Sequence, residues 1–198
     1  MLEEKRIRNM FDGLVENELQ VGIKEEILGE FLRVVKKPNI YIWCNKTLIP
    51  KLMDYFVIKN GCGFDIISWH KTNAMPLCGS KYLTDTEYCL YFHDGIKLNT
   101  TYETAKTHYE QPINIKDKGL FEHLTIKPLN ILKNFVINSS KENDIVADFF
   151  CGSATTCVAS KELNRQYIGI EIEPKWAQIA QNRLDGITAD GQMSLFLR

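Results

Sequence analysis

The chain has 198 residues, of which 44% are hydrophobic and 25% charged, and its formal net charge is −1. This composition is typical of a globular protein with its own core, and the balance of acids and bases neither supports nor excludes a nucleic-acid partner. No apolar run approaches the roughly 20 residues of a membrane-spanning helix, and the N-terminus lacks the apolar stretch of a signal peptide. We therefore expect a cytoplasmic protein with no membrane contact.

The chain contains six cysteines, none of which forms a Cys-x-x-Cys pair. Zinc sites usually show such spacing, so we expect no metal site. Several of the cysteines lie inside apolar runs, which favours buried, reduced thiols.

The first half of the chain alternates between helical and strand-like patterns. Apolar residues at helical spacing predict a helix over residues 23–37, which Pro38 ends. The further segments are a strand at 40–44, a helix at 47–60 closed by Gly61, and strands at 64–69 and 87–92.

The second half begins with residues 93–122, which show little periodicity. A connection of this length is usually functional or partly disordered. After it we predict a helix over 129–138 opened by Pro128, a strand ending at Asp148, a helix over 154–164, a strand ending at Glu171 and a helix over 173–184.

Alternating strands and helices predict an α/β fold with a mainly parallel sheet and helices on both faces. Ligands in such folds bind at the carboxyl ends of the strands. We therefore expect Asn45, the segment after Trp69, Asp148 and Glu171 to gather along one edge of the sheet.

The turn Asp148-Phe-Phe-Cys-Gly-Ser-Ala154 indicates which ligand this edge binds. It has one glycine where a dinucleotide fingerprint has three, and its acid would repel a pyrophosphate but could accept a hydrogen bond from an ammonium group. Glu171 follows about 20 residues later, where a carboxylate can bind both ribose hydroxyls. Together they favour S-adenosylmethionine as the cofactor. Two alternatives remain: a turn that binds nothing, with Asp148 capping the helix, and a nicotinamide-dependent oxidoreductase, for which the glycines are too few.

Several segments resemble one family. The turn with its continuation Thr-Thr156 and Arg165-Gln-Tyr-Ile-Gly-Ile-Glu171-Ile are similar to the cofactor motif of bacterial and phage DNA amino-methyltransferases, which methylate adenine N6 or cytosine N4. His123-Leu-Thr-Ile-Lys-Pro128 resembles the family's His-Pro-Thr-x-Lys-Pro element. Trp69-His-Lys-Thr-Asn-Ala-Met-Pro76 and Lys81-Tyr-Leu-Thr-Asp-Thr-Glu-Tyr88 resemble its Trp-x-Lys and Glu-Tyr segments. The order of the segments is that of the family's beta group.

The resemblance implies a Rossmann-like methyltransferase fold with double-stranded DNA as partner, and adenine N6 as the target. It implies one methyltransferase domain over residues 1–198, with the cofactor-binding half at 123–198. The implied substrate-binding residues are Trp69, Lys71 and Asn73, and residues 93–122, with Tyr102, Lys106, His108, Tyr109 and Lys116, are a candidate for part of target recognition. The implied cofactor-binding residues are Asp148, Phe149, Phe150, Gly152, Ser153, Thr155, Glu171, His123, Thr125, Lys127 and Pro128.

Three departures from the family pattern qualify this reading. Ala154 replaces a glycine, which is tolerable only if its φ angle is negative, and Leu124 replaces a proline. The family's Asp/Asn/Ser-Pro-Pro-Tyr/Phe tetrapeptide is missing, since the chain has no Pro-Pro dipeptide. In that motif a polar side chain and a proline carbonyl accept the N–H hydrogens of the target amine, and the aromatic ring stacks on the flipped base.

The beta-group order places the missing tetrapeptide before Met1, so we expect an N-terminally incomplete fold whose catalytic residues are unknown. The alternative to a site-specific DNA methyltransferase is a remnant or half-enzyme, which binds cofactor or DNA but needs a second chain to catalyse.

Overall fold

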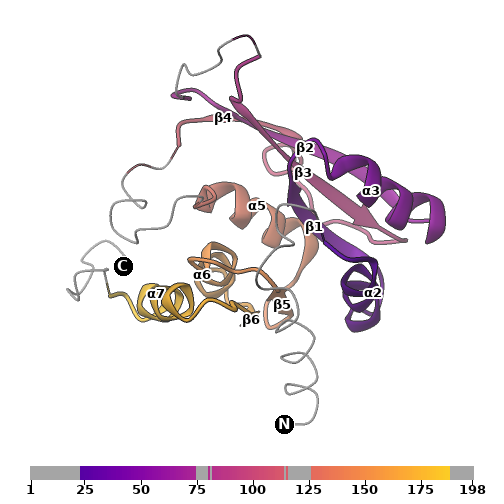
Figure 1. Cartoon of the computed structure of the whole chain (residues 1–198). Helices are drawn as coiled ribbons and strands as arrows, with labels where there is room; N and C mark the ends of the chain where they lie inside the picture. Colours follow the sequence, from indigo (N-terminus) through magenta and orange to yellow (C-terminus); the bar gives the residue numbers. More distant parts are fainter. Residues whose placement is uncertain (1–22, 75–79, 81, 114, 116–125, 188–198) are drawn as a thin grey trace. The chain divides into compact units, whose positions relative to one another are not determined.

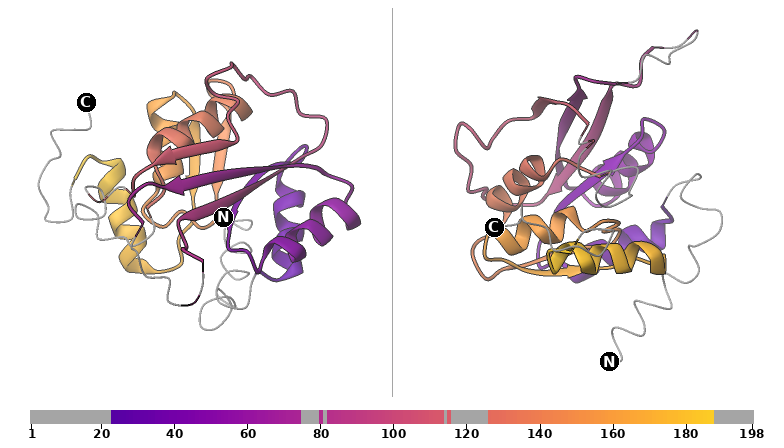
Figure 2. Two further views of the ribbon diagram at one scale, coloured as in Figure 1. Left: turned by 90° about the horizontal axis from the view of Figure 1, so that it is seen from above. Right: turned by 90° about the vertical axis from the view of Figure 1, so that its left-hand side faces the viewer.

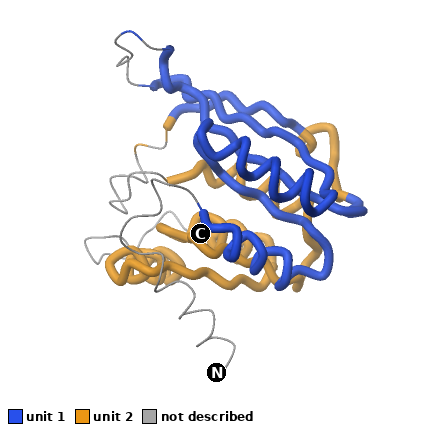
Figure 3. Tube along the Cα trace, turned by 45° about the vertical axis from the view of Figure 1, so that its right-hand side comes forward, with its two compact units in different colours: residues 1–97, 106–112 blue, residues 98–105, 113–198 orange. Residues whose placement is uncertain are grey.

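The computed structural model describes residues 23–74, 80, 82–113, 115 and 126–187 (Figure 1). The chain divides into two compact units: residues 1–97 and 106–112 form unit 1, and residues 98–105 and 113–198 form unit 2 (Figure 3). The chain therefore enters unit 2 at Leu98, returns to unit 1 at Lys106 and enters unit 2 again at Ile113.

Unit 1 contains a four-stranded sheet of order β1-β3-β2-β4. Its β3 pairs antiparallel with both β1 and β2, whereas the short β4 pairs parallel with β2. Residue partners along the β2–β4 pair run from Ser68↔His108 to Lys71↔Gln111. The four strands are β1 (Asn39–Cys44), β2 (Gly63–Lys71), β3 (Thr86–His93) and β4 (His108–Gln111).

Three helical segments complete the described part of unit 1. Helix α2 (Glu25–Val34) buries Ile27, Leu28 and Phe31, and α3 (Ile49–Met53) continues directly into the π-helical turn η1 (Asp54–Lys59). Phe56 of η1 is fully buried and stacks on Phe92 of β3, with ring centroids 4.3 Å apart. This aromatic contact fixes η1 against the sheet.

Unit 2 contains a βαβ element. Strands β5 (Ile145–Asp148) and β6 (Gln166–Gly169) pair in parallel, in register from Ile145↔Gln166 to Asp148↔Gly169. Helix α6 (Thr155–Glu162) connects them and packs against both strands, and α5 (Leu129–Ser139) and α7 (Pro174–Leu184) contact α6 (Figures 1 and 2). Apolar residues of α5 and α6, among them Ile131, Phe135 and Val158, are buried.

The α/β prediction is confirmed, with one correction: the sheet of unit 1 is mixed, not mainly parallel. A parallel pair needs a crossover connection, usually a helix, whereas the described residues between β2 and β3 contain no helix. The two strands therefore run antiparallel.

Residues 93–113, the continuous described part of the segment 93–122, contain more regular structure than the sequence predicts. They contribute β4 to unit 1, and the segment Leu98–Ala105 is hydrogen-bonded within unit 2. The Asn99 N–H donates to the Asn138 carbonyl at 2.7 Å, and the Asn138 side-chain amide donates to the Thr104 carbonyl at 2.8 Å. Across all the described ranges, no helix is both long and apolar enough to cross a bilayer.

Candidate functional site

The turn between β5 and α6 is built on two residues in the left-handed region of backbone conformation. Gly152 has φ 50°, which favours glycine, and Ala154 has φ 61°. The left-handed conformation costs an alanine about 1–2 kcal/mol. The replacement of the family's glycine by Ala154 therefore falls at a strained position, and Ala154 is only 1% exposed.

Asp148 lies at the carboxyl end of β5, where the turn starts. Its Oδ1 accepts a hydrogen bond from the Phe150 N–H at 3.1 Å, and the Thr156 hydroxyl donates to the same carboxyl group. Burial raises the pKa of Asp148 above its ordinary value of 3.8; the two hydrogen bonds oppose this rise, and the charge of Glu171 adds to it. The N-cap residue of α6 is Ala154, which makes no side-chain capping hydrogen bond, and the backbone N–H that Asp148 binds is that of Phe150, before the helix.

Glu171 follows β6 and reaches back to the same turn. One carboxylate oxygen accepts a hydrogen bond from the Gly152 N–H at 2.9 Å, and the other accepts one from the Glu173 N–H at 3.0 Å. The predicted meeting of Asp148 and Glu171 at the strand ends is thus present in unit 2. Each carboxylate oxygen has a second acceptor position, so Glu171 can still bind hydroxyl groups of a ligand.

Other residues predicted for the cofactor site lie around this turn. Phe149 is half-buried, and the side chain of Phe150 is exposed. The side chains of Ser153 and Thr155 are buried and accept hydrogen bonds inside unit 2. Because these side chains face the interior, a cofactor could contact Ser153 and Thr155 only through their backbone groups.

The predicted element upstream of α5 is described only in part. Lys127 is half-buried, and the buried Pro128 precedes α5. Ile126, next to them, packs with Ile179 and Trp176 of α7. His123 and Thr125 lie outside the described residues.

Arg183 is the residue of this site that sequence reasoning missed. It lies on α7 and is 3% exposed, and its Nη1 donates hydrogen bonds to the carbonyl and hydroxyl of Ser153 and to the hydroxyl of Thr155. The apolar stripe of α7 contains a sequence pattern from which a buried arginine could have been predicted. Trp176, Ile179 and Ala180 are followed, at the next helical position, by a charged side chain.

The predicted substrate residues lie in unit 1. Trp69 is 2% exposed, and its indole N–H donates to the Gln111 carbonyl at 2.9 Å. Lys71 forms an ion pair with Glu87 at 2.7 Å and lies over the Trp69 ring at 5.6 Å. In this arrangement Trp69 and Lys71 stabilise the sheet, whereas Asn73 is exposed.

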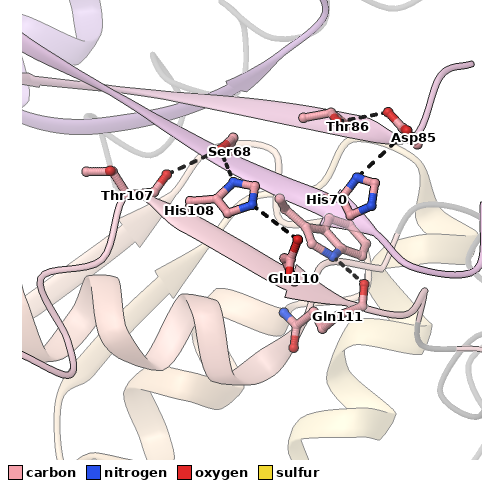
Figure 4. A network of polar contacts seen from close by, with 9 residues as sticks. Ser68, His70, Asp85, Thr86, Thr107, His108, Glu110 and Gln111 are labelled. Carbon is pink, nitrogen blue, oxygen red and sulfur yellow. Dashed lines mark hydrogen bonds and ion pairs between the residues drawn. The ribbon is translucent and has the colours of Figure 1, made fainter.

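A polar network joins the end of β2 to its neighbours (Figure 4). Ser68 and the His108 ring are hydrogen-bonded at 2.8 Å, and His108 lies 3.7 Å from Glu110. His70 lies 3.8 Å from Asp85, the residue just before β3. His108 and Glu110 are largely exposed, so the network acts mainly to join β4 to β2.

Comparisons with known proteins identify the family. A family model described as DNA methylase, with N6 and N4 in its name, matches residues 16–182. The chain belongs to this family of DNA methylases, as the resemblance predicts.

The relatives include type II methyltransferases. M2.DpnII of Streptococcus pneumoniae is 31% identical over 182 residues, which are 82% of this chain and 68% of the relative. M2.LlaDCHI of Lactococcus lactis subsp. cremoris is 34% identical over 171 residues, 77% of this chain and 63% of the relative. M.HinfI of Haemophilus influenzae is 32% identical over 151 residues, which are 67% of this chain but only 40% of the relative.

Solved structures show the same fold. The complex of M1.HpyAVI with SAM superposes with a TM-score of 0.70 at 30% identity, covering 81% of both chains. The cytosine-N4-specific PvuII methyltransferase superposes with a TM-score of 0.59 at 15% identity, covering 70% of this chain and 57% of the other. The second likeness shows the fold alone.

Proposed function

We propose that this chain carries the cofactor site of a site-specific DNA methyltransferase, which transfers a methyl group from S-adenosylmethionine to an exocyclic amino group in double-stranded DNA. The observation that carries the proposal is the meeting of Asp148 and Glu171 around one turn at the ends of β5 and β6. Membership of the DNA methylase family supports it.

The residues of the turn fit this cofactor. The half-buried Asp148 carboxylate can accept hydrogen bonds from the methionyl ammonium, and Glu171 can accept them from the ribose hydroxyls. Positive φ at Gly152 shapes the turn so that its N–H faces the Glu171 carboxylate. The cofactor itself supplies an electrophilic methyl group on a sulfonium, and the chain's part is to bind and orient it.

Calorimetry with S-adenosylmethionine, S-adenosylhomocysteine and NADH tests this assignment. We expect binding of the first two and none of NADH, because an acid at the start of the turn disfavours a pyrophosphate. Binding of NADH alone would instead support the oxidoreductase alternative.

We propose adenine N6 as the target amine. The support is the overall resemblance of the segments, since the family and its fold serve both adenine and cytosine enzymes. The exposed Tyr102 and His108 keep residues 93–122 a candidate for DNA contact, whereas Lys116 lies outside the described residues. Digestion to nucleosides of DNA methylated in the presence of the segment or second chain that supplies the catalytic tetrapeptide would distinguish N6-methyladenine from N4-methylcytosine.

A second proposal concerns catalysis by this chain alone. The sequence has no Pro-Pro dipeptide, and the chain spans 63% and 68% of the two type II relatives M2.LlaDCHI and M2.DpnII. We propose that the catalytic tetrapeptide comes from a further segment or a second chain. The coding sequence upstream of Met1, read in all frames, tests this: a Pro-Pro-Tyr stretch there indicates a split or mis-started gene, and its absence favours a remnant.

Incubation of the purified chain with duplex DNA and tritiated S-adenosylmethionine tests the same proposal directly. We expect cofactor binding without transfer of label to DNA. Efficient labelling by this chain would mean that it contains a complete active site.

A further inference from the structure

We infer that Arg183 is a positioning residue for the cofactor turn: it holds the strained backbone at Ser153–Thr155 from the interior of unit 2 and keeps the turn in place when a cofactor occupies Glu171. This inference rests on the proposed function. Three observations support it: the contacts of Arg183, the conformation of Ala154 and the position of Glu171.

The first observation is the number of contacts that one atom makes. Arg183 Nη1 lies 3.0 Å from the Ser153 carbonyl oxygen, 3.3 Å from the Ser153 hydroxyl and 2.9 Å from the Thr155 hydroxyl. These acceptors flank Ala154 on both sides. A buried guanidinium that contacts both neighbours of one residue restrains the backbone between them.

The second observation is the strain at that residue. Ala154 is held at φ 61°, a conformation that an alanine adopts only when its surroundings enforce it. Its N–H donates to the Cys151 carbonyl at 2.7 Å, and its side chain packs in a small cluster with Cys157 and Ala180. The contacts of Arg183 add hydrogen bonds on each side of this position.

The third observation is that Glu171 holds the adjacent residue. Its carboxylate accepts from the Gly152 N–H, while Arg183 donates to the carbonyl of Ser153, the next residue. Glu171 is half-buried and Arg183 is buried. When ribose hydroxyls share the Glu171 carboxylate with the Gly152 N–H, the contacts of Arg183 continue to hold the turn at the next residue.

Arg165 offers a matched control within the same unit. Like Arg183 it donates hydrogen bonds to hydroxyl and carbonyl groups, here to the hydroxyl and carbonyl of Ser140 and to the Leu163 carbonyl. These acceptors follow α5 and α6 and do not belong to the cofactor turn. Loss of either arginine lowers stability, but only the loss of Arg183 should change the turn.

The experiment measures S-adenosylmethionine affinity by calorimetry and global stability by urea unfolding for Arg183→Met, Arg183→Lys and Arg165→Met. We expect Arg183→Met to weaken affinity about tenfold or more, which corresponds to about 1.4 kcal/mol, and Arg165→Met to change it less than about twofold. The three contacts with Ser153 and Thr155 use one nitrogen of Arg183, and a lysine ammonium has three donors, so Arg183→Lys should recover part of the loss.

Ala154→Gly tests the mechanism. If Arg183 acts by holding a strained turn, glycine at 154 should reduce the loss of affinity caused by Arg183→Met severalfold. Equal losses in both backgrounds would contradict this mechanism. Should Arg183→Met fail to fold, Thr155→Val removes one acceptor of the same contact, and its affinity is then compared with that of Arg165→Met.

Hydrogen exchange of the ligand-free protein distinguishes a failure of the proposed cofactor site from a failure of the inference about Arg183. We expect Arg183→Met to speed exchange of the amides at residues 151–156 beyond the change in Arg165→Met. If the wild-type chain binds no S-adenosylmethionine, the proposed function fails whatever the exchange shows. If the wild type binds and Arg183→Met binds equally well with unchanged exchange, the inference about Arg183 is wrong.

Discussion

At the scale of single residues, Asp148 combines a proposed role in cofactor binding with a cost to stability. Its pKa is raised in the folded protein, chiefly by burial, so the folded state binds a proton more tightly than the unfolded chain does. The contribution of this carboxyl to stability therefore falls as pH rises above 3.8, the ordinary value, and reaches its lowest level above the folded pKa.

Asp148→Asn removes this charge. We expect the free energy of unfolding to rise at pH 7, with a smaller gain or none near pH 4, where the carboxyl of the unfolded chain is itself partly protonated. Urea unfolding at the two pH values measures the difference. A gain of equal size at both would mean that the charge is not its cause.

Cofactor binding should show the opposite dependence on the same group. An ionised Asp148 attracts the methionyl ammonium, so the affinity for S-adenosylmethionine should fall as pH is lowered through the raised pKa of Asp148. Calorimetry as a function of pH checks this, and Asp148→Asn should bind weakly with a smaller pH dependence. A pH-independent affinity in the wild type would argue against contact between Asp148 and the ammonium.

Gly169 is a position where only glycine fits without rearrangement. A Cβ atom there would lie 2.8 Å from Cys157 Sγ and 3.1 Å from Cys151 Sγ. We expect Gly169→Ala to lower the free energy of unfolding by about 1–3 kcal/mol, the usual cost of overpacking. Cys157→Ala removes the nearer sulfur, so its combination with Gly169→Ala should cost less than the sum of the single changes. Strict additivity in urea unfolding would contradict a direct clash.

At the scale of elements, periodicity predicted most of the fold, and its failures have physical reasons. Apolar periodicity located α2, α5 and α7 to within a few residues, and apolar runs located β1, β2 and β3. Strand β4 was missed because His108-Tyr-Glu-Gln111 has no apolar alternation; its pairing with β2 and the Ser68–His108 hydrogen bond define it. Such long-range partners cannot be read from a local pattern.

The sequence also predicted only part of the candidate site. The acid at each strand end predicted the meeting of Asp148 and Glu171, because the ends of parallel neighbours are adjacent. The sequence could not reveal the left-handed conformation of Ala154, since it is set by tertiary contacts, nor that Glu171 binds the Gly152 N–H. The buried Arg183 contradicts the usual exposure of arginine, so only its place in an apolar stripe could have suggested it.

The hydrogen bond between Asn138 of α5 and the segment Leu98–Ala105 can be tested for its contribution to stability. Asn138 is 6% exposed, and its side-chain N–H donates to the Thr104 carbonyl. We expect Asn138→Ala to lower the free energy of unfolding by about 1–2 kcal/mol, because the Thr104 carbonyl loses its donor. As a control, Glu142→Ala at an exposed position after α5 should change it by less than about 0.5 kcal/mol. Equal effects of both changes in urea unfolding would show that the contact contributes nothing.

At the scale of the whole molecule, the family is established and the full reaction is a proposal. Unit 2 brings the acids of two strands to one turn and holds that turn through Arg183. Unit 1 contributes a mixed sheet in which Trp69 and Lys71 serve the packing. The fold is shared with a cytosine-N4-specific enzyme, so the fold alone does not define the target amine, and adenine N6 is a proposal.

The path of the chain through the two units limits how this protein can exchange parts with its relatives. Leu98–Ala105 precedes β4 in sequence, yet its hydrogen bonds to Asn138 belong to unit 2, for which we propose the cofactor site. A recombination junction within residues 106–112 would therefore join α5 of one parent to the Asn99–Thr104 partners of another. A junction just before Leu98 keeps these partners together but separates β4 from β2, its neighbour in unit 1. Functional hybrids should therefore need residues 98–105 from the parent of unit 2 and residues 106–112 from the parent of unit 1.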